Sequence, residues 1–273
     1  MRFTGPLAVC TSAPGTLDLF GHDEAGNLLQ LAWCDGKWHG HNLSSEFGLA
    51  PKVPFVGDLA ACATPARIDI FGQNPKNPGR LLHLTRVNGQ WQPLVREQTG
   101  LLFKGHVAAC TRVEGVIDVF GIDTQGILWH LTNEQGKWRS TNLSKLLPGT
   151  LRDMSHTQGL TAGWFDDQLE VYWTDKNGEL HWLQSVGDKW QLCGSTEQFR
   201  LPPATRLGGQ VTACSWNCHR EIFATAVTRQ EIQNFTTGKS ETIEVWRLIQ
   251  LSGQRAQPSS DLTWGSKNLF DVI

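Results

Sequence analysis

Five short segments, each with an acid in second place and an aromatic residue in fourth place, recur along the chain. They occupy residues 17–21, 68–72, 117–121, 169–173 and 220–224. The aromatic positions 20, 71, 120, 172 and 223 are separated by 51, 49, 52 and 51 residues. A fixed period in this range predicts a repeat architecture, so a residue found in every repeat belongs first to the repeated fold.

Each repeat contains four short apolar runs separated by turn-forming residues. In the first repeat they cover residues 7–10, 17–21, 28–33 and 38–44, with glycines at 15, 26 and 36 between them. Short runs divided by such turns predict strands rather than helices. First strands are further expected at 59–62, 107–110, 160–163 and 211–214, third strands at 81–84, 128–131 and 180–183, and fourth strands from Trp91, Trp138 and Trp190.

The fifth repeat is longer than the others. A polar segment, residues 228–242, precedes its third strand at 245–248, and a second segment, residues 252–261, precedes its fourth strand at 263–269. Five units of four antiparallel strands predict an all-β fold, a five-bladed β-propeller. A β-solenoid fits less well, since its coils are normally shorter and lack four turn signals. The blades are expected at 7–48, 58–97, 107–146, 158–196 and 209–270, within a single domain over residues 1–273.

The first strand of each repeat carries small residues, which predicts that it lies innermost, where the blades converge. The aromatic residue of the second strand is expected to pack between blades. Four of the seven cysteines, Cys10, Cys62, Cys110 and Cys214, share one place in the first strand. They lie in different repeats and form no Cys-x-x-Cys pair, so we interpret them as buried small residues rather than zinc ligands.

Composition excludes several classes of function. The formal net charge is −2, and 18% of residues are charged without any basic run, which argues against nucleic-acid binding. No apolar run is long enough to span a bilayer, so no membrane insertion is expected. Residues 1–6 lack the apolar stretch of a signal peptide. This favours a cytoplasmic protein, or one exported without a classical signal peptide.

The repeat resembles that of the bacterial lectin-type β-propellers found in Photorhabdus and its relatives. The third repeat carries the likeness best, with Ile-Asp-Val-Phe-Gly at 117–121, Leu-Trp-His-Leu at 128–131 and Gly-Lys-Trp at 136–138. The blade plan is also similar to the fungal fucose-binding propeller lectins, and the blade number to the tachylectin type. The resemblance implies carbohydrate binding in shallow pockets between neighbouring blades, repeated around the propeller, with no catalysis.

The sequence departs from the fungal fucose lectins at the residues that hold the sugar. Those lectins use an arginine on the second strand and a glutamate on the third. Here the arginine place holds Asp18, Asp69, Asp118, Glu170 and Glu221, and the glutamate place holds Gln30, His83, His130 or an apolar residue. Fucose specificity is therefore not carried over.

Two sets of residues are candidates for sugar binding. The fourth-strand tryptophans offer flat apolar faces on which a sugar ring stacks, although packing between blades would explain them equally. They are Trp38, Trp91, Trp138, Trp190 and Trp264. The third-strand polar residues Gln30, His83, His130 and His181 offer hydrogen bonds to hydroxyl groups, and the alternative is a solvated strand face. His181 is one position out of register, because Trp182 takes the matching place.

The recurring acids are poor material for a glycosidase. Such an enzyme needs two carboxyl groups in two different environments, whereas these five stand in near-equivalent places. A structural role is preferred for them. Asp23, Asp123 and Asp175 each precede a glycine by three residues, which predicts turn capping rather than calcium binding. No metal or cofactor is expected.

We therefore expect a non-catalytic, multivalent lectin whose partners are glycans or glycoconjugates. Two alternatives stay open at this stage. One is a propeller that binds a protein partner through residues 228–242, without any sugar site. The other is a five-bladed glycoside hydrolase.

Overall fold

A computed structural model describes most of the chain. The described residues are 2–46, 56–74, 79–93, 95–96, 100–165, 168–187, 189–194, 205–216, 219–233, 240–254 and 263–272. They fall into two compact units, Met1–Ser155 and His156–Ile273. Among the described residues, no helix combines the length and apolar character needed to cross a bilayer.

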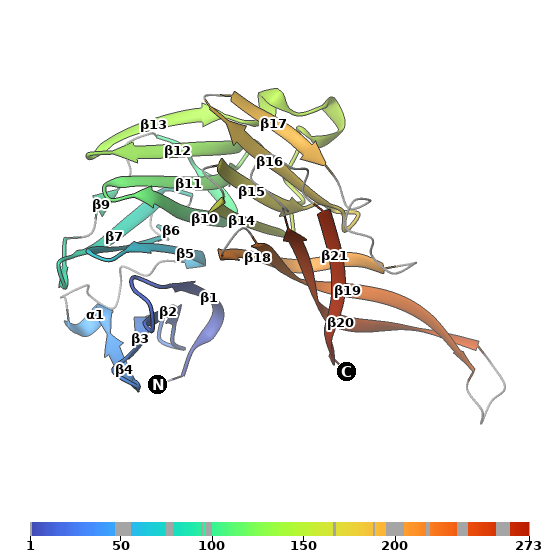
Figure 1. The fold of residues 1–273 in the computed structure, drawn as a ribbon, viewed down its shortest axis with the longest axis horizontal. Helices are drawn as coiled ribbons and strands as arrows, with labels where there is room; N and C mark the ends of the chain where they lie inside the picture. Colours follow the sequence, from blue (N-terminus) through green and yellow to red (C-terminus); the bar gives the residue numbers. More distant parts are fainter. Residues whose placement is uncertain are drawn as a thin grey trace. The chain divides into compact units, whose positions relative to one another are not determined.

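Five antiparallel sheets follow one another along the chain, one for each sequence repeat (Figure 1). In four of them the four strands lie in sequence order, and in the remaining sheet the fourth strand is split into two short pieces that both pair with the third. These sheets are the blades of a five-bladed β-propeller. The predicted fold class is confirmed.

The first unit contains three blades. Blade 1 consists of β1 (Thr4–Cys10), β2 (Leu17–His22), β3 (Leu28–Cys34) and β4 (Lys37–Asn42), followed by the short helix α1 (Leu43–Glu46). Blade 2 consists of β5 (Val56–Thr64), β6 (Arg67–Gln73), β7 (Leu81–Val87), β8 (Gln90–Trp91) and β9 (Val95–Arg96). Blade 3 consists of β10 (Phe103–Val113), β11 (Val116–Asp123), β12 (Leu128–Glu134) and β13 (Lys137–Asn142), and the 3-10 turns η1 (Ser144–Leu146) and η2 (Gly149–Leu151) follow it.

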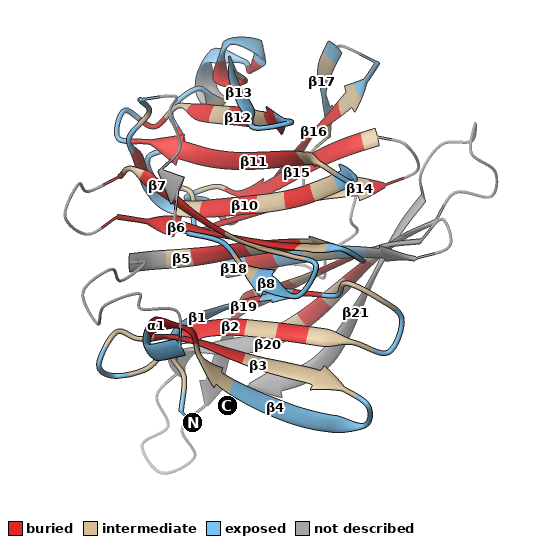
Figure 2. Cartoon of the chain, turned by 90° about the vertical axis from the view of Figure 1, so that its left-hand side faces the viewer, coloured by how far each residue is buried: buried red, intermediate tan, exposed pale blue. Residues whose placement is uncertain are grey.

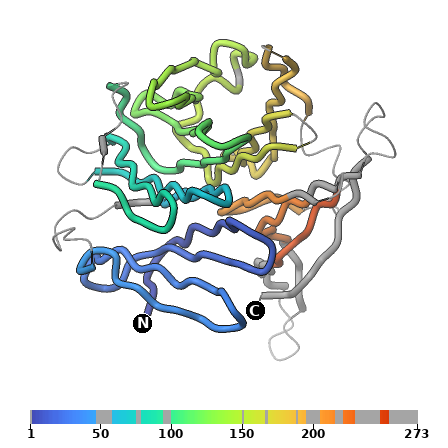
Figure 3. The backbone as a smooth tube through the Cα atoms, turned by 60° about the vertical axis from the view of Figure 1, so that its left-hand side comes forward, coloured from blue at the N-terminus to red at the C-terminus, as the bar shows by residue number. Residues whose placement is uncertain are grey.

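The second unit contains two blades. Blade 4 consists of β14 (Gly159–Phe165), β15 (Gln168–Thr174), β16 (Leu180–Val186) and β17 (Lys189–Gly194). Blade 5 consists of β18 (Thr205–Trp216), β19 (His219–Gln233), β20 (Ser240–Gln254) and β21 (Thr263–Val272). In Figure 3 the backbone tube can be followed back and forth through the strands β1 to β4 of blade 1.

The small first strands lie side by side, as the sequence predicts. Within the first unit β5 contacts both β1 and β10, and within the second unit β14 contacts β18. Cys10, Cys62 and Cys110 are buried on these strands. Burial is the main cause that raises the pKa of all three thiols, so they stay protonated and inert. Cys214 differs from the prediction, because it is exposed.

The core consists of layers between neighbouring blades. One cluster joins Phe20 and Leu28 of blade 1 to Ile70 and Leu84 of blade 2. A second joins blades 2 and 3, and a third joins blades 4 and 5. Figure 2 shows β11 buried along most of its length and β4 exposed at the edge of its blade. The second-strand aromatics Phe20, Phe71 and Tyr172 are fully buried in these clusters, which confirms their predicted packing between blades. Phe120 is also fully buried, whereas Phe223 is only half-buried.

The first strands begin earlier than the small residues indicate. In β1, β5, β10 and β18 the pairing with the second strand is irregular just before the run of small residues. In β10, for example, the register shifts between Phe103 and Val107, which marks a bulge. Gly5, Gly105 and Gly209 lie there with φ of 84°, 84° and 86°, a region that favours glycine. The extra turn of chain brings Phe103 against Gly121, where a Cβ would lie 2.6 Å from the phenyl ring.

The fourth strands end earlier than expected. Leu43 and Ser44 belong to α1 rather than to β4, and the Ser44 hydroxyl accepts a hydrogen bond from the Leu28 amide at 2.9 Å. Blade 3 repeats this bond between Ser144 and Leu128, also at 2.9 Å. The serine thus closes the start of the third strand in both blades.

The polar segment of the fifth repeat is not an insertion between two strands. The ladder between β19 and β20 continues from Thr228 paired with Val245 to Gln233 paired with Ser240, so the second and third strands extend through it. Residues 234–239 and 255–262 lie outside the described residues. Because β18 pairs only as far as Thr228 and β21 only as far as Trp246, residues 229–233 and 240–245 form a two-stranded ribbon.

Candidate functional site

The recurring acid of the second strand binds a polar residue of the third strand. In blade 1, Gln30 Nε2 donates to Asp18 Oδ1 at 2.6 Å. In blades 2 and 3, His83 Nε2 donates to Asp69 Oδ1 at 2.7 Å and His130 Nε2 donates to Asp118 Oδ1 at 2.8 Å. The third-strand residue pairs with the aromatic position rather than with the acid, so this bond runs diagonally across the sheet.

Blades 4 and 5 keep the bond with different residues. Trp182 occupies the diagonal place in blade 4, so Gln184, directly opposite Glu170, donates at 2.8 Å instead. In blade 5, Gln250 Nε2 and Ser252 Oγ donate to Glu221 at 2.8 Å and 2.5 Å. Sequence reasoning missed Gln184 and Gln250, although both stand in the third strand. Gln184 is directly opposite its acid, and Gln250 is opposite Phe223, two residues from Glu221. The structural role predicted for the acids is confirmed for Asp69, Asp118, Glu170 and Glu221.

These third-strand side chains are buried, so the alternative of a solvated strand face is wrong. Gln30, His83 and His130 are exposed by 3%, 6% and 9%. The two imidazoles also stack on the aromatic residues opposite them, His83 on Phe71 at 4.5 Å and His130 on Phe120 at 4.7 Å between ring centroids. Each side chain is therefore an anchor inside its blade.

Arginines complete two of the acid sites. Arg67 Nε donates to Asp69 Oδ2 at 2.7 Å, and Arg112 Nε donates to Asp118 Oδ2 at 3.0 Å. Burial alone would raise the pKa of Asp69, but the hydrogen bonds and charges of His83 and Arg67 outweigh it and hold the pKa below its ordinary value. Asp69 is therefore an ionised, fully engaged carboxylate.

His181 lies on the other face of its strand. It pairs with Trp173 and stacks on that indole at 5.5 Å, and its Nε2 donates to Asp175 Oδ2 at 3.2 Å. Asp175 Oδ1 accepts the amides of Asn177 and Glu179, which confirms the predicted turn cap. Asp23 and Asp123 cap their turns in the same way.

Asp175, Glu179 and His181 together form a group of potential metal ligands. The same arrangement occurs in blade 3 with a tryptophan, which cannot bind a metal. There Trp129, in the register position of His181, donates from Nε1 to Asp123 Oδ2 at 2.8 Å. His181 does the same for Asp175, and the bond belongs to the turn.

The fourth-strand tryptophans Trp91 and Trp138 pack against the preceding blade. Trp91 of blade 2 stands edge-on to Phe20 of blade 1, and Trp138 of blade 3 stands edge-on to Phe71 of blade 2, both at 6.2 Å. Trp38 is 48% exposed, and its ring centroid lies 5.3 Å from that of Trp33 in the same blade. Trp190 is half-buried, and the side chain of Trp264 lies outside the described residues.

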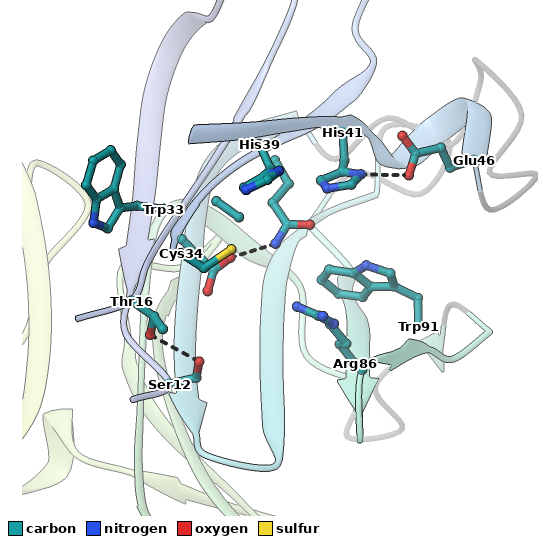
Figure 4. A pocket seen from close by; sticks show the side chains of 13 residues that line it. Ser12, Thr16, Trp33, Cys34, His39, His41, Glu46, Arg86 and Trp91 are labelled. Atoms are coloured by element: carbon teal, nitrogen blue, oxygen red, sulfur yellow. Dashed lines mark hydrogen bonds and ion pairs between the residues drawn. The ribbon is translucent and has the colours of Figure 1, made fainter. Parts of the chain in front are cut away.

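A cavity of about 490 Å³ lies between blades 1 and 2. Blade 1 contributes Asp18, Gln30, two residues of the turn between β1 and β2, and residues of β3, β4 and α1. Blade 2 contributes Arg86, Gly89 and Trp91. Figure 4 shows Arg86 and Trp91 on one side of the cavity, facing Ser12, Thr16 and Cys34 across it, with His39 and His41 above. Two of the predicted sugar-binding residues, Gln30 and Trp91, therefore meet in one cavity.

The charged groups of this cavity are unequally satisfied. Glu46 is paired with His41 at 3.2 Å. The Arg86 guanidinium is half-buried and has no hydrogen-bond or ion-pair partner among the described residues. Asp18 accepts only the bond from Gln30 among the side chains described. The cavity thus presents one carboxylate oxygen and one guanidinium, beside an indole. Sequence reasoning missed Arg86, which replaces the uncharged residues Trp33 and Asn133 of the neighbouring repeats in the same register position.

No family profile and no curated protein matches this sequence. Solved structures match in fold. The fucose-specific lectin from Aleuria aurantia has a TM-score of 0.60 at 16% identity, covering 89% of this chain and 77% of that chain. The BP39L lectin from Burkholderia pseudomallei has a TM-score of 0.61 at 20% identity, covering 94% and 68%. The SapL1 lectin, in complex with alpha methyl fucoside, has a TM-score of 0.55 at 16% identity, covering 100% and 97%. At these low identities the likeness establishes the propeller fold alone. The predicted similarity to the fungal propeller lectins is therefore confirmed for the fold.

Proposed function

We propose that this protein is a non-catalytic lectin that binds glycans in grooves between its blades. The observation that carries the proposal is the cavity between blades 1 and 2, which brings Trp91 together with the unsatisfied groups of Asp18 and Arg86. The lectins of similar fold support it, since the Aleuria aurantia lectin is fucose-specific and SapL1 is known in complex with alpha methyl fucoside. The Photorhabdus-type repeat resemblance supports the same class of function.

The chemistry of the cavity fits a neutral sugar with adjacent hydroxyl groups. A hydroxyl both donates and accepts, so one can donate to Asp18 Oδ2 while its neighbour accepts from Arg86. Asp18 and Arg86 carry charges of opposite sign, which suits a neutral ligand with hydroxyl groups better than an ionic one. The indole of Trp91 offers an apolar surface for the C–H face of the ring.

The five acids do not support catalysis. Four of them accept at least two side-chain hydrogen bonds within their own blades, so they are not available as a catalytic pair. Glu46 lines the same cavity but is held by His41. Binding without turnover is therefore the function that the geometry favours.

A glycan array with the purified protein tests the proposal, followed by titration of the best ligand against three variants. Asp18→Asn and Trp91→Ala should each weaken binding about tenfold or more, because each removes a group that touches the sugar. Gln92→Ala, at an exposed neighbour of Trp91, should bind as the native protein does. An array without any bound glycan, or hydrolysis of aryl glycosides by the native protein, would overturn the proposal.

A further inference from the structure

One of the five recurring acids is incompletely satisfied. Asp69 accepts from His83 and Arg67, Asp118 from His130, Thr132 and Arg112, Glu170 from Gln184 and Tyr172, and Glu221 from Gln250 and Ser252. Asp18 accepts from Gln30 alone, although it is only 5% exposed. A buried carboxylate with a free oxygen is costly unless a further donor reaches it.

The free oxygen of Asp18 faces the cavity. Among the described side-chain atoms, only His22 Nε2 is both sealed from solvent and without a partner. Asp18 Oδ2 is not in that state, so it keeps access to the space that Asp18 lines. A donor that satisfies this oxygen must therefore come from the cavity.

The register shows what is missing beside Asp18. Each acid of the first unit pairs with a cysteine, Asp18 with Cys10, Asp69 with Cys62 and Asp118 with Cys110. In blade 2 the arginine that binds the acid is Arg67, two residues before Asp69. In blade 3 it is Arg112, two residues after Cys110. The matching residues of blade 1 are Thr16 and Ser12, which are hydrogen-bonded to each other at 3.4 Å and form the cavity wall. Two short side chains thus replace the arginine.

We infer that Arg67 is a built-in occupant of the blade 2 acid site, and that a glycan takes the equivalent place in blade 1 because Thr16 and Ser12 leave it open. The inference rests on the proposed function. It makes the residue two before the acid a specificity-determining position, because an arginine there fills the site and a threonine opens it. The groove between blades 2 and 3 has the other parts of the site, since His83 and Trp138 stand there in the places of Gln30 and Trp91.

The grooves are therefore unequal. Arg67 Nε satisfies the same Oδ2 atom that is free in Asp18, and the hydroxyl of Thr64 is hydrogen-bonded to Glu114 across the second groove. Opposite the acid, the cationic Arg86 of the first groove is replaced by Asn133, whose amide oxygen already accepts from Gly136. A sugar entering the second groove would find neither a free acceptor nor a free guanidinium.

Fluorine NMR of protein labelled with 5-fluorotryptophan tests this inference at individual grooves. Trp91 reports the first groove and Trp138 the second, and Trp91→Phe and Trp138→Phe variants assign their signals. The probe is a mixture of the methyl glycosides of fucose, mannose, galactose and N-acetylglucosamine. In the native protein we expect the probe to shift the Trp91 signal and leave the Trp138 signal in place.

Two reciprocal substitutions follow. Thr16→Arg should weaken the response of Trp91 at least about tenfold, because the new guanidinium occupies Asp18 Oδ2. Arg67→Thr should create a response of Trp138 that the native protein lacks. Ala25→Arg adds the same charge to an exposed turn at the other end of blade 1 and should change neither signal.

The outcomes separate the inference from the proposed function. If the probe and the glycan array both leave the native protein unchanged, the proposed function and the inference fall together. If Trp91 responds in the native protein and responds equally in Thr16→Arg, glycan binding stands and the inference is overturned. The same holds if Trp138 already responds in the native protein. Should Arg67→Thr fail to fold, Thr16→Arg decides the question alone.

Discussion

The indole of Trp138, on the fourth strand of blade 3, stands edge-on to the imidazole of His83, on the third strand of blade 2, with ring centroids 6.1 Å apart and planes at 86°. His83 in turn stacks on Phe71 and donates to Asp69, which also binds Arg67. A side chain at the edge of blade 3 is thus connected, through two contacts, to the buried carboxylate Asp69 of blade 2.

Removing this indole should destabilise the fold. Trp138→Ala should lower the free energy of unfolding by roughly 2 kcal/mol, because it leaves a cavity against Phe71 and His83. Trp38→Ala, at a side chain that is 48% exposed, should cost less than about half of that. Urea denaturation followed by circular dichroism measures both, and equal losses would contradict the packing role of Trp138.

The diagonal hydrogen bond to the acid should tolerate the residue that blade 1 uses there. His130→Gln keeps a donor for Asp118 and should cost about 1 kcal/mol, mainly through the lost stacking on Phe120. His130→Ala leaves that donor site empty and should cost roughly 2–3 kcal/mol. The midpoints of urea unfolding give the comparison. If alanine proves as good as glutamine, the bond does not anchor the third strand.

Stability should fall on mild acidification because of His22. Burial lowers the pKa of His22 from 6.5, and its Nε2 is sealed without a partner. The unfolded chain therefore binds a proton at His22 more readily than the folded protein does. The free energy of unfolding is unaffected by His22 above pH 6.5 and decreases as the pH falls below that value. His22→Gln should flatten the decline in melting temperature between about pH 7 and pH 5. An unchanged slope would show that His22 protonates freely in the folded state.

Thiol reactivity should separate the cavity from the inner strands. Cys34 lines the cavity between blades 1 and 2, whereas Cys62 is buried and burial raises the pKa of its thiol. Iodoacetamide followed by peptide mass mapping should therefore label Cys34 in the native protein and Cys62 only after unfolding. A glycan bound in the cavity should slow the labelling of Cys34, while the exposed Cys214 serves as the internal control.

The ribbon of blade 5 should be dispensable for folding. Thr228 and Val245 pair directly, so an Asn-Gly turn can join them in place of residues 229–244. Because β18 and β21 do not pair with the removed residues, the shortened protein should keep its circular dichroism spectrum and its glycan binding. Lost glycan binding in a folded variant would place a sugar contact on the ribbon instead.

The repeat in the sequence was sufficient to predict five blades, the order of their strands and the innermost place of the small first strands. Each of these follows from local patterns, since alternation, turn residues and period are properties of neighbouring residues. Three points stay predictions. They are the single domain over residues 1–273, the localisation, and sugar binding by the fourth-strand tryptophans. Strand ends were less accurate, because the bulge at Gly5 and the serine bond at Ser44 depend on partners elsewhere in the blade.

The periodic pattern alone determined that the second-strand acids are equivalent by position, and that third-strand polar residues and fourth-strand tryptophans accompany them. Only the tertiary structure decided that they are not equivalent in chemistry. Arg67 and Arg112 reach their acids from different strands, so no single column of the repeat reveals them, and Arg86 meets Asp18 only across two blades. A repeat pattern records what the copies share, whereas an open site depends on which side chains from separate strands fill the same space.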